Sequence, residues 1–189
     1  DLGGCTGRVA RHVATLRPAG KVTLADIHPA YVQWVAKHAA GKYQAVQTNA
    51  EPPLPLADRS LDLVSAYSVF SHIDHNDETW LADLRRVLKP NGVAYLTILD
   101  EASWEYTRTH EWFAQSMSRG GKNVSFLGAL AAGGIPEEKY VVRTSDSEAY
   151  NCCVFLRRSY VERVWAKYFR DLRFEVGGHE YQTIVIARS

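Results

Sequence analysis

The chain has 189 residues, 46% of them hydrophobic, which is enough for one globular domain with a sizeable core. A formal net charge of +1 creates no field that attracts a polyanion, so nucleic acid is not an expected partner. No apolar run reaches the length that spans a bilayer, so no membrane partner is expected, and three cysteines without a C-x-x-C spacing argue against a disulfide framework. We therefore expect a cytoplasmic protein.

Residues 1–8 form a glycine-dense turn that opens directly into a helical pattern. Gly3, Gly4 and Gly7 can adopt positive φ and allow a backbone to approach a ligand closely. The helix that follows is expected to point its free N–H groups at whatever the turn holds. Asp1 would accept hydrogen bonds from that ligand or brace the turn. Because the chain starts inside this turn and without Met, we expect that it lacks an N-terminal piece.

Strands and helices alternate along most of the chain, which predicts βαβ units and an α/β fold with a doubly wound, mostly parallel sheet. Residues 100–158 interrupt this rhythm, and we predict that they form a variable insertion that binds the substrate, within a single domain 1–189. A helix over 159–169 and an antiparallel strand pair at the C-terminus follow. The earlier expected elements are helices over 9–16, 29–39 and 77–88, strands over 22–26, 43–48, 61–67 and 93–99, a loop at 52–56 and a turn at 89–92.

In an open parallel sheet, ligands bind over the carboxyl ends of the strands. Asp26 ends the second strand nineteen positions after Gly7, a spacing at which a carboxylate reaches ribose hydroxyls, although it could instead cap the next helix. Asn49 ends the third strand, where its amide can meet an adenine edge or simply form a turn.

Two nucleoside cofactors compete for this arrangement. A nicotinamide dinucleotide needs G-x-G-x-x-G, but Cys5 and Arg8 occupy its second and third glycine positions, so the pyrophosphate cradle is poorly made. S-adenosylmethionine carries no phosphate and needs only a glycine turn beside its amino-acid end.

The opening residues 1–7, DLGGCTG, resemble the D-x-G-x-G-x-G motif of class I S-adenosylmethionine-dependent methyltransferases. Further similarities follow at Asp26, at 49–56, at 61–64, at 84–92, and at 67–73, which looks like a bacterial small-molecule subgroup. The resemblance covers residues 1–98 well, 159–189 moderately and 100–158 hardly at all.

The resemblance implies a set of cofactor-binding residues. The glycine turn would contact the methionine end, Asp26 would hold the ribose, and Ile27 would pack on the adenine. Because the second glycine of the motif is Cys5 here, cofactor binding would be weakened if that position requires positive φ. The full set is Asp1, Gly3, Gly4, Cys5, Asp26, Ile27, Asn49, Ala50, Tyr67 and Ser68.

Methyl transfer from a sulfonium needs alignment of donor and acceptor and, for a protonated acceptor, a general base. His72 is the candidate base, and its alternative role is a structural one in which the ring pins its loop. The run 72–77 contains residues that bind metals, but we expect Asp74, Asn76 and Asp77 to include the N-cap of the next helix, and no metal site is expected.

We therefore predict an enzyme that methylates O, N or C of a small-molecule acceptor. The alternatives are a Rossmann-type oxidoreductase and a non-catalytic, methyltransferase-like binding module. The aromatic group Trp104, Tyr106, Trp112 and Phe113 is interpreted either as an acceptor-binding lid or as core packing, and Cys152 and Cys153 as buried strand residues.

Overall fold

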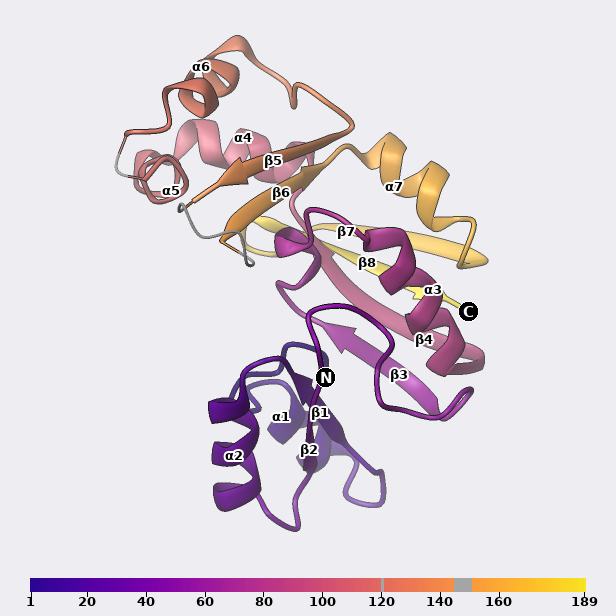
Figure 1. The fold of residues 1–189 in the computed structure, drawn as a ribbon. Helices are drawn as coiled ribbons and strands as arrows, with labels where there is room; N and C mark the ends of the chain where they lie inside the picture. The colour runs from indigo at the N-terminus through magenta and orange to yellow at the C-terminus, as the bar shows by residue number, and fades with distance from the viewer. Residues whose placement is uncertain (120, 145–150) are drawn as a thin grey trace.

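The computed structural model describes residues 1–119, 121–144 and 151–189, and the part of the predicted insertion at 120 and 145–150 lies outside these described residues. Its strands form a mixed sheet, as predicted (Figure 1). β1 pairs with β2 and β3 with β4 in parallel, whereas β8 pairs antiparallel with both β4 and β7. The strands are β1 (Thr23–Asp26), β2 (Gln44–Gln47), β3 (Leu61–Ala66), β4 (Leu88–Ile98), β7 (Asp171–His179) and β8 (Gln182–Arg188).

The first three residues of the chain join the two halves of this sheet. Leu2 donates its N–H to the Ser65 carbonyl at 2.7 Å and forms a parallel bridge with Ala25 on its other side. Gly3 then donates its N–H to Ala25 at 2.8 Å. The order across the sheet is therefore β2, β1, residues 1–3, β3, β4, β8 and β7. As a result, the glycine turn lies beside the carboxyl ends of β1 and β3.

Seven α-helices and one 3-10 helix accompany the sheet in the described ranges. α2 packs on β1 and β2, while α3 contacts β4 and α7 (Figure 1). None of these helices combines the length and apolarity needed to cross a membrane. Their bounds are α1 (Ala10–Leu16), α2 (Pro29–His38), η1 (Phe70–His72), α3 (Asp77–Val87), α4 (Glu101–Thr109), α5 (Glu111–Met117), α6 (Val124–Ala132) and α7 (Arg158–Trp165).

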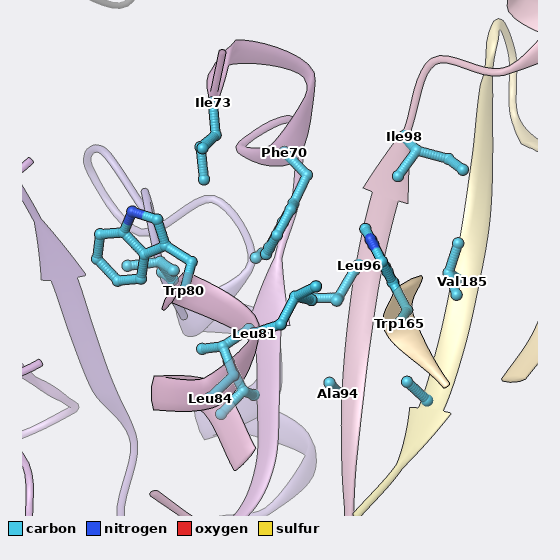
Figure 2. Packing of buried hydrophobic residues seen from close by; sticks show 14 of the residues in the cluster. Phe70, Ile73, Trp80, Leu81, Leu84, Ala94, Leu96, Ile98, Trp165 and Val185 are labelled. Atoms are coloured by element: carbon cyan, nitrogen blue, oxygen red, sulfur yellow. The ribbon is translucent and has the colours of Figure 1, made fainter. Parts of the chain in front are cut away.

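The main hydrophobic core fills the space between α3, α7 and the sheet (Figure 2). Leu81 and Leu84 of α3 are completely buried there, and Trp165 of α7 packs its ring 5.1 Å from the ring of Phe70. Because Phe70 begins η1, this packing fixes the segment that follows β3. Burial of large aromatic and aliphatic side chains thus holds η1 in place over the end of the sheet.

The predicted turn at 89–92 is wrong. β4 begins at Leu88 and runs through these residues, with a shift of register opposite Leu61 and Leu63. Asn91 has φ +64° within this stretch. A strand irregularity of this kind tolerates Pro90, which has no N–H, and a residue with positive φ, so turn-forming residue types here mark a bulge.

The insertion contains a hairpin that the periodicity did not predict. β5 (Lys139–Arg143) pairs antiparallel with β6 (Cys152–Leu156), and Phe155 forms a parallel bridge with Leu99 just beyond β4. Cys152 is 1% exposed, as expected for a buried strand residue, whereas Cys153 is only partly buried by surface area. The hairpin therefore extends the sheet's carboxyl edge and contacts η1 there.

Candidate active site

Asp26 is the polar residue that connects β1 to the glycine turn. It is 4% exposed, and its two carboxylate oxygens accept backbone N–H groups from Cys5 and His28, each at 2.8 Å. The N-cap position of α2 is occupied by His28, and no side chain forms a capping hydrogen bond there. Asp26 therefore does not cap that helix. Because each carboxylate oxygen has two lone pairs, both can still accept a hydrogen bond from a ligand.

The side-chain carboxylate of Asp1 stabilises the glycine turn through two hydrogen bonds. Its Oδ1 accepts from the Ser65 hydroxyl at 3.0 Å, and its Oδ2 accepts the Ala10 N–H, the first of α1, at 3.1 Å. The expectation that the N-terminal N–H groups of α1 face the ligand is therefore not met, because the helix starts at Ala10 and this N–H is directed to Asp1. Asp1 shapes the turn without lining the pocket described below.

The glycine turn needs left-handed backbone at two of its pocket-lining positions. Gly3 has φ +65°, and a Cβ there would lie 2.6 Å from Cγ2 of Val69. Cys5 has φ +50°, although it is not glycine. Gly4 instead packs over Leu24, where a Cβ would lie 2.6 Å from Cγ, so its role is in packing. Cys5 therefore occupies a position that favours glycine.

This geometry predicts that Cys5→Gly stabilises the protein. Removal of the left-handed strain outweighs the extra entropy of glycine in the unfolded chain, so we expect the free energy of unfolding to rise by about 0.5–1 kcal/mol. Urea denaturation measures the change. Cys5→Ala is the matched control, since it removes the thiol but keeps the Cβ, and it should bring no gain. An equal rise in both variants would show that the thiol, and not the backbone, is the cause.

A pocket of about 250 Å³ opens over the carboxyl ends of residues 1–3 and of strands β1, β2 and β3. Of the predicted residues it includes Gly3, Cys5, Asp26, Ile27, Ala50, Ser68 and His72, whereas Asp1, Gly4, Asn49 and Tyr67 are not in its lining. The lining residues that sequence reasoning missed are Leu2, His28, Tyr31, Thr48, Val69, Ile73 and Trp80.

Thr48 is the most informative of the missed residues. It is 5% exposed, follows β2, and its Oγ1 has no hydrogen-bond partner within the described ranges. A buried hydroxyl without a partner costs free energy unless a ligand or water satisfies it. Together with the carboxylate of Asp26, it gives the pocket both a donor and acceptors for a polar nucleoside. The residues present therefore fit the adenosine part of S-adenosylmethionine.

His72 lies at the end of η1 and lines the pocket. Its Nδ1 is 2.6 Å from the Cys152 carbonyl, and the Cys152 Sγ in turn donates to the His72 carbonyl at 3.4 Å. A carbonyl can only accept, so Nδ1 carries the proton and the lone pair of the neutral ring is on Nε2. The hydrogen bond from Nδ1 thus attaches the loop to β6, while Nε2 of His72 keeps a lone pair that can accept a proton.

Ser68 and Tyr67 leave β3 in different directions. Ser68 has φ +56°, lines the pocket, and accepts a hydrogen bond from Nε2 of Gln182 at 3.1 Å. The Tyr67 hydroxyl lies 2.7 Å from Nδ1 of His179, in the strand pair β7–β8. Burial, followed by the nearby phenol of Tyr181, raises the pKa of Tyr67, so this hydroxyl stays protonated at neutral pH.

The aromatic residues of the insertion separate into core and surface. Trp104 is 2% exposed and Phe113 7% exposed, in a second core cluster that contains Phe126 and Phe155. Trp112 is 57% exposed. None of the aromatic residues between 104 and 113 lines the pocket, so Trp104 and Phe113 act in core packing.

The run 72–77 is occupied by ion pairs. Asp77 accepts from the Lys139 ammonium at 2.7 Å, and Asp74 pairs with Arg143. Asn76 is at the capping position of α3 but donates its amide to Glu51 instead of capping the helix. Within the described ranges, no group of three or more His, Cys, Asp or Glu side chains could hold a metal ion.

The alternating fold and a pocket over adjoining strand ends are the features of an α/β domain with its ligand site at the carboxyl ends of the strands. A family model described as a methyltransferase domain matches residues 1–96, and the chain belongs to this family of S-adenosylmethionine-dependent methyltransferases. Its cofactor is S-adenosylmethionine. Comparison with curated protein sequences gives no match.

Solved structures show the same fold at low sequence identity. An S-adenosylmethionine-dependent methyltransferase from Methanosarcina mazei aligns with a TM-score of 0.66 and 16% identity, over 100% of this chain and 90% of that one. A second, from Mesorhizobium loti, aligns with a TM-score of 0.65 and 12% identity, over 100% and 89%. Human N-acetylserotonin methyltransferase, solved with S-adenosylmethionine, aligns with a TM-score of 0.58 and 21% identity, over 100% and 46%.

Proposed function

We propose that the pocket over β1, β2 and β3 binds S-adenosylmethionine and that the domain transfers its methyl group to O, N or C of a small molecule. The supporting observation is that Cys5, Asp26, Thr48, Ser68 and His72, from four separate stretches of sequence, line one pocket. The sulfonium of the bound cofactor supplies an electrophilic methyl group.

The adenosine would lie on the side of the pocket formed by β1 and β2. The free lone pairs of the Asp26 carboxylate would accept from the ribose hydroxyls, and Ile27 would pack on the adenine. The Thr48 hydroxyl, which has no partner in the described ranges, would hydrogen-bond the nucleoside. Ala50 would border the adenine edge, and the exposed Asn49 would reach it only from outside the pocket lining.

The reacting end would lie between the glycine turn and η1. Gly3 and Cys5 would contact the methionine part, while Ser68 and His72 would face the acceptor. Nε2 of His72 would take the proton that an oxygen or nitrogen acceptor loses, and its Nδ1–H bond to Cys152 would hold the ring in this orientation. Alignment of donor and acceptor can contribute roughly 7–11 kcal/mol to such a displacement.

The acceptor would enter from the insertion 100–158. β6 contacts η1 through Cys152, and Arg143 of β5 is paired with Asp74 just after η1, so the hairpin would form a wall next to His72, beyond the lining of the pocket itself. A wall built from a variable insertion is suited to selecting one acceptor among many.

The test is transfer of a labelled methyl group from S-adenosylmethionine into fractionated cell extract. We expect label in the small-molecule fraction, and mass spectrometry of that fraction would identify the acceptor. Label that enters only the protein or nucleic-acid fraction would contradict a small-molecule acceptor. Binding of the cofactor without transfer to any fraction would favour a non-catalytic binding module.

A further inference from the structure

The indole ring of Trp80 brings an unused hydrogen-bond donor to the pocket. Trp80 belongs to α3, is 4% exposed and lines the pocket. In the part of the chain that the structure describes, its indole N–H has no hydrogen-bond partner. Figure 2 shows the ring nitrogen on the side where Ile73, a second lining residue, lies. A donor buried this deeply is expected to be satisfied by a ligand or by water.

Two hydrogen bonds attach α3 to the loop that follows β2, and they lie on either side of Trp80 along the helix. At the start of α3 the Asn76 amide donates to Glu51 at 2.7 Å. Near its end the Asp83 carboxylate accepts the Leu54 N–H, also at 2.7 Å. The residues just before this loop line the pocket. Trp80 therefore belongs to the β2 side of the pocket, where the adenosine is proposed to lie.

We propose that the indole N–H of Trp80 donates a hydrogen bond to a ring nitrogen of the cofactor's adenine and so helps to select that base. This inference rests on the proposed binding of S-adenosylmethionine in the pocket. An indole N–H can only donate, and the N1, N3 and N7 atoms of adenine can only accept. The ribose hydroxyls, in contrast, would be bound by the acceptor oxygens of Asp26.

The experiment is calorimetric titration of the full chain with S-adenosylhomocysteine, which keeps the adenosine after methyl transfer, and with its 1-deaza, 3-deaza and 7-deaza analogues. In each analogue a C–H group replaces one ring nitrogen. We expect the wild-type protein to bind one analogue about tenfold more weakly than S-adenosylhomocysteine, because the indole donor then has no acceptor.

Trp80→Phe removes the donor but keeps an aromatic ring. We expect it to bind S-adenosylhomocysteine about tenfold more weakly than the wild-type protein does, and to bind the discriminated analogue no more weakly than S-adenosylhomocysteine itself. Trp34→Phe is the matched control, since Trp34 on α2 is 44% exposed and outside the pocket lining, and it should keep all the wild-type affinities.

A second measurement on the wild-type protein makes the test independent of how well the variant folds. The indole N–H proton resonance of Trp80 should move downfield when S-adenosylhomocysteine binds and should not do so with the discriminated analogue. A resonance that S-adenosylhomocysteine leaves in place would contradict the hydrogen bond.

Other outcomes separate this inference from the proposed function. If Trp80→Phe weakens S-adenosylhomocysteine and all three analogues by the same factor, the indole ring only fills space and the inference is wrong, while cofactor binding stands. The same holds if Trp80→Phe changes no affinity. If the wild-type protein binds none of these ligands, the pocket does not hold the cofactor, and the proposed function itself is wrong.

Discussion

Replacement of Asp26 by alanine is expected to weaken the affinity for S-adenosylmethionine by at least about a hundredfold. The change removes the acceptors that would hold the ribose, and two hydrogen bonds to a charged group at about 1.5–3 kcal/mol each account for a loss of this size. It also leaves the N–H groups of Cys5 and His28 without their acceptor, so the free energy of unfolding should fall by about 2–4 kcal/mol. Calorimetric titration and urea denaturation measure the two effects.

Asp26→Asn separates binding from folding. It keeps the size of the side chain and one acceptor oxygen, so the loss of stability should be smaller than in Asp26→Ala, while cofactor affinity still falls. Asp62→Asn is a suitable control, because the Asp62 side chain is 83% exposed and pairs with Lys89 at the surface. Cofactor affinity that survives Asp26→Ala would place the ribose elsewhere.

Replacement of His72 by asparagine is expected to lower methyl transfer by about 10²–10⁴-fold with little change in cofactor affinity. The asparagine amide can still donate to the Cys152 carbonyl in place of Nδ1, so the loop stays attached to β6, but it offers no base in place of Nε2. Transfer of labelled methyl to the acceptor found in cell extract gives the rate, and titration gives the affinity.

Two further variants decide between the catalytic and the structural role of His72. His72→Ala removes both ring nitrogens and should add a loss of stability to the loss of turnover. His12→Asn, on the exposed surface of α1, should change neither. If His72→Asn turns over at nearly the wild-type rate, the histidine only pins the loop and the proton leaves by another route.

Local sequence patterns predict much of this fold. The alternation of strands with helices and the C-terminal strand pair are confirmed, because each depends on periodicity and turn residues that lie close together in sequence. The prediction of a turn at 89–92 is wrong because it used the local pattern alone. Lys-Pro-Asn-Gly is locally typical of a turn, yet pairing of the flanking residues with β3 keeps it in β4 as a bulge. The hairpin β5–β6 is joined to the end of β4 by a bridge between Leu99 and Phe155, two residues far apart in sequence, and no local pattern contains such a contact.

The sequence by itself determined the α/β class, the glycine turn and the carboxylate at the end of β1. These depend on backbone conformation and on residue types at strand ends, which short stretches encode. Only the tertiary structure decided which side chains line the pocket, bringing in Thr48 and Trp80 and leaving out Asn49 and Tyr67. It also decided the tautomer of His72. The reason is that a side chain's direction and its hydrogen-bond partners come from packing between segments far apart in the chain, such as η1 against β6.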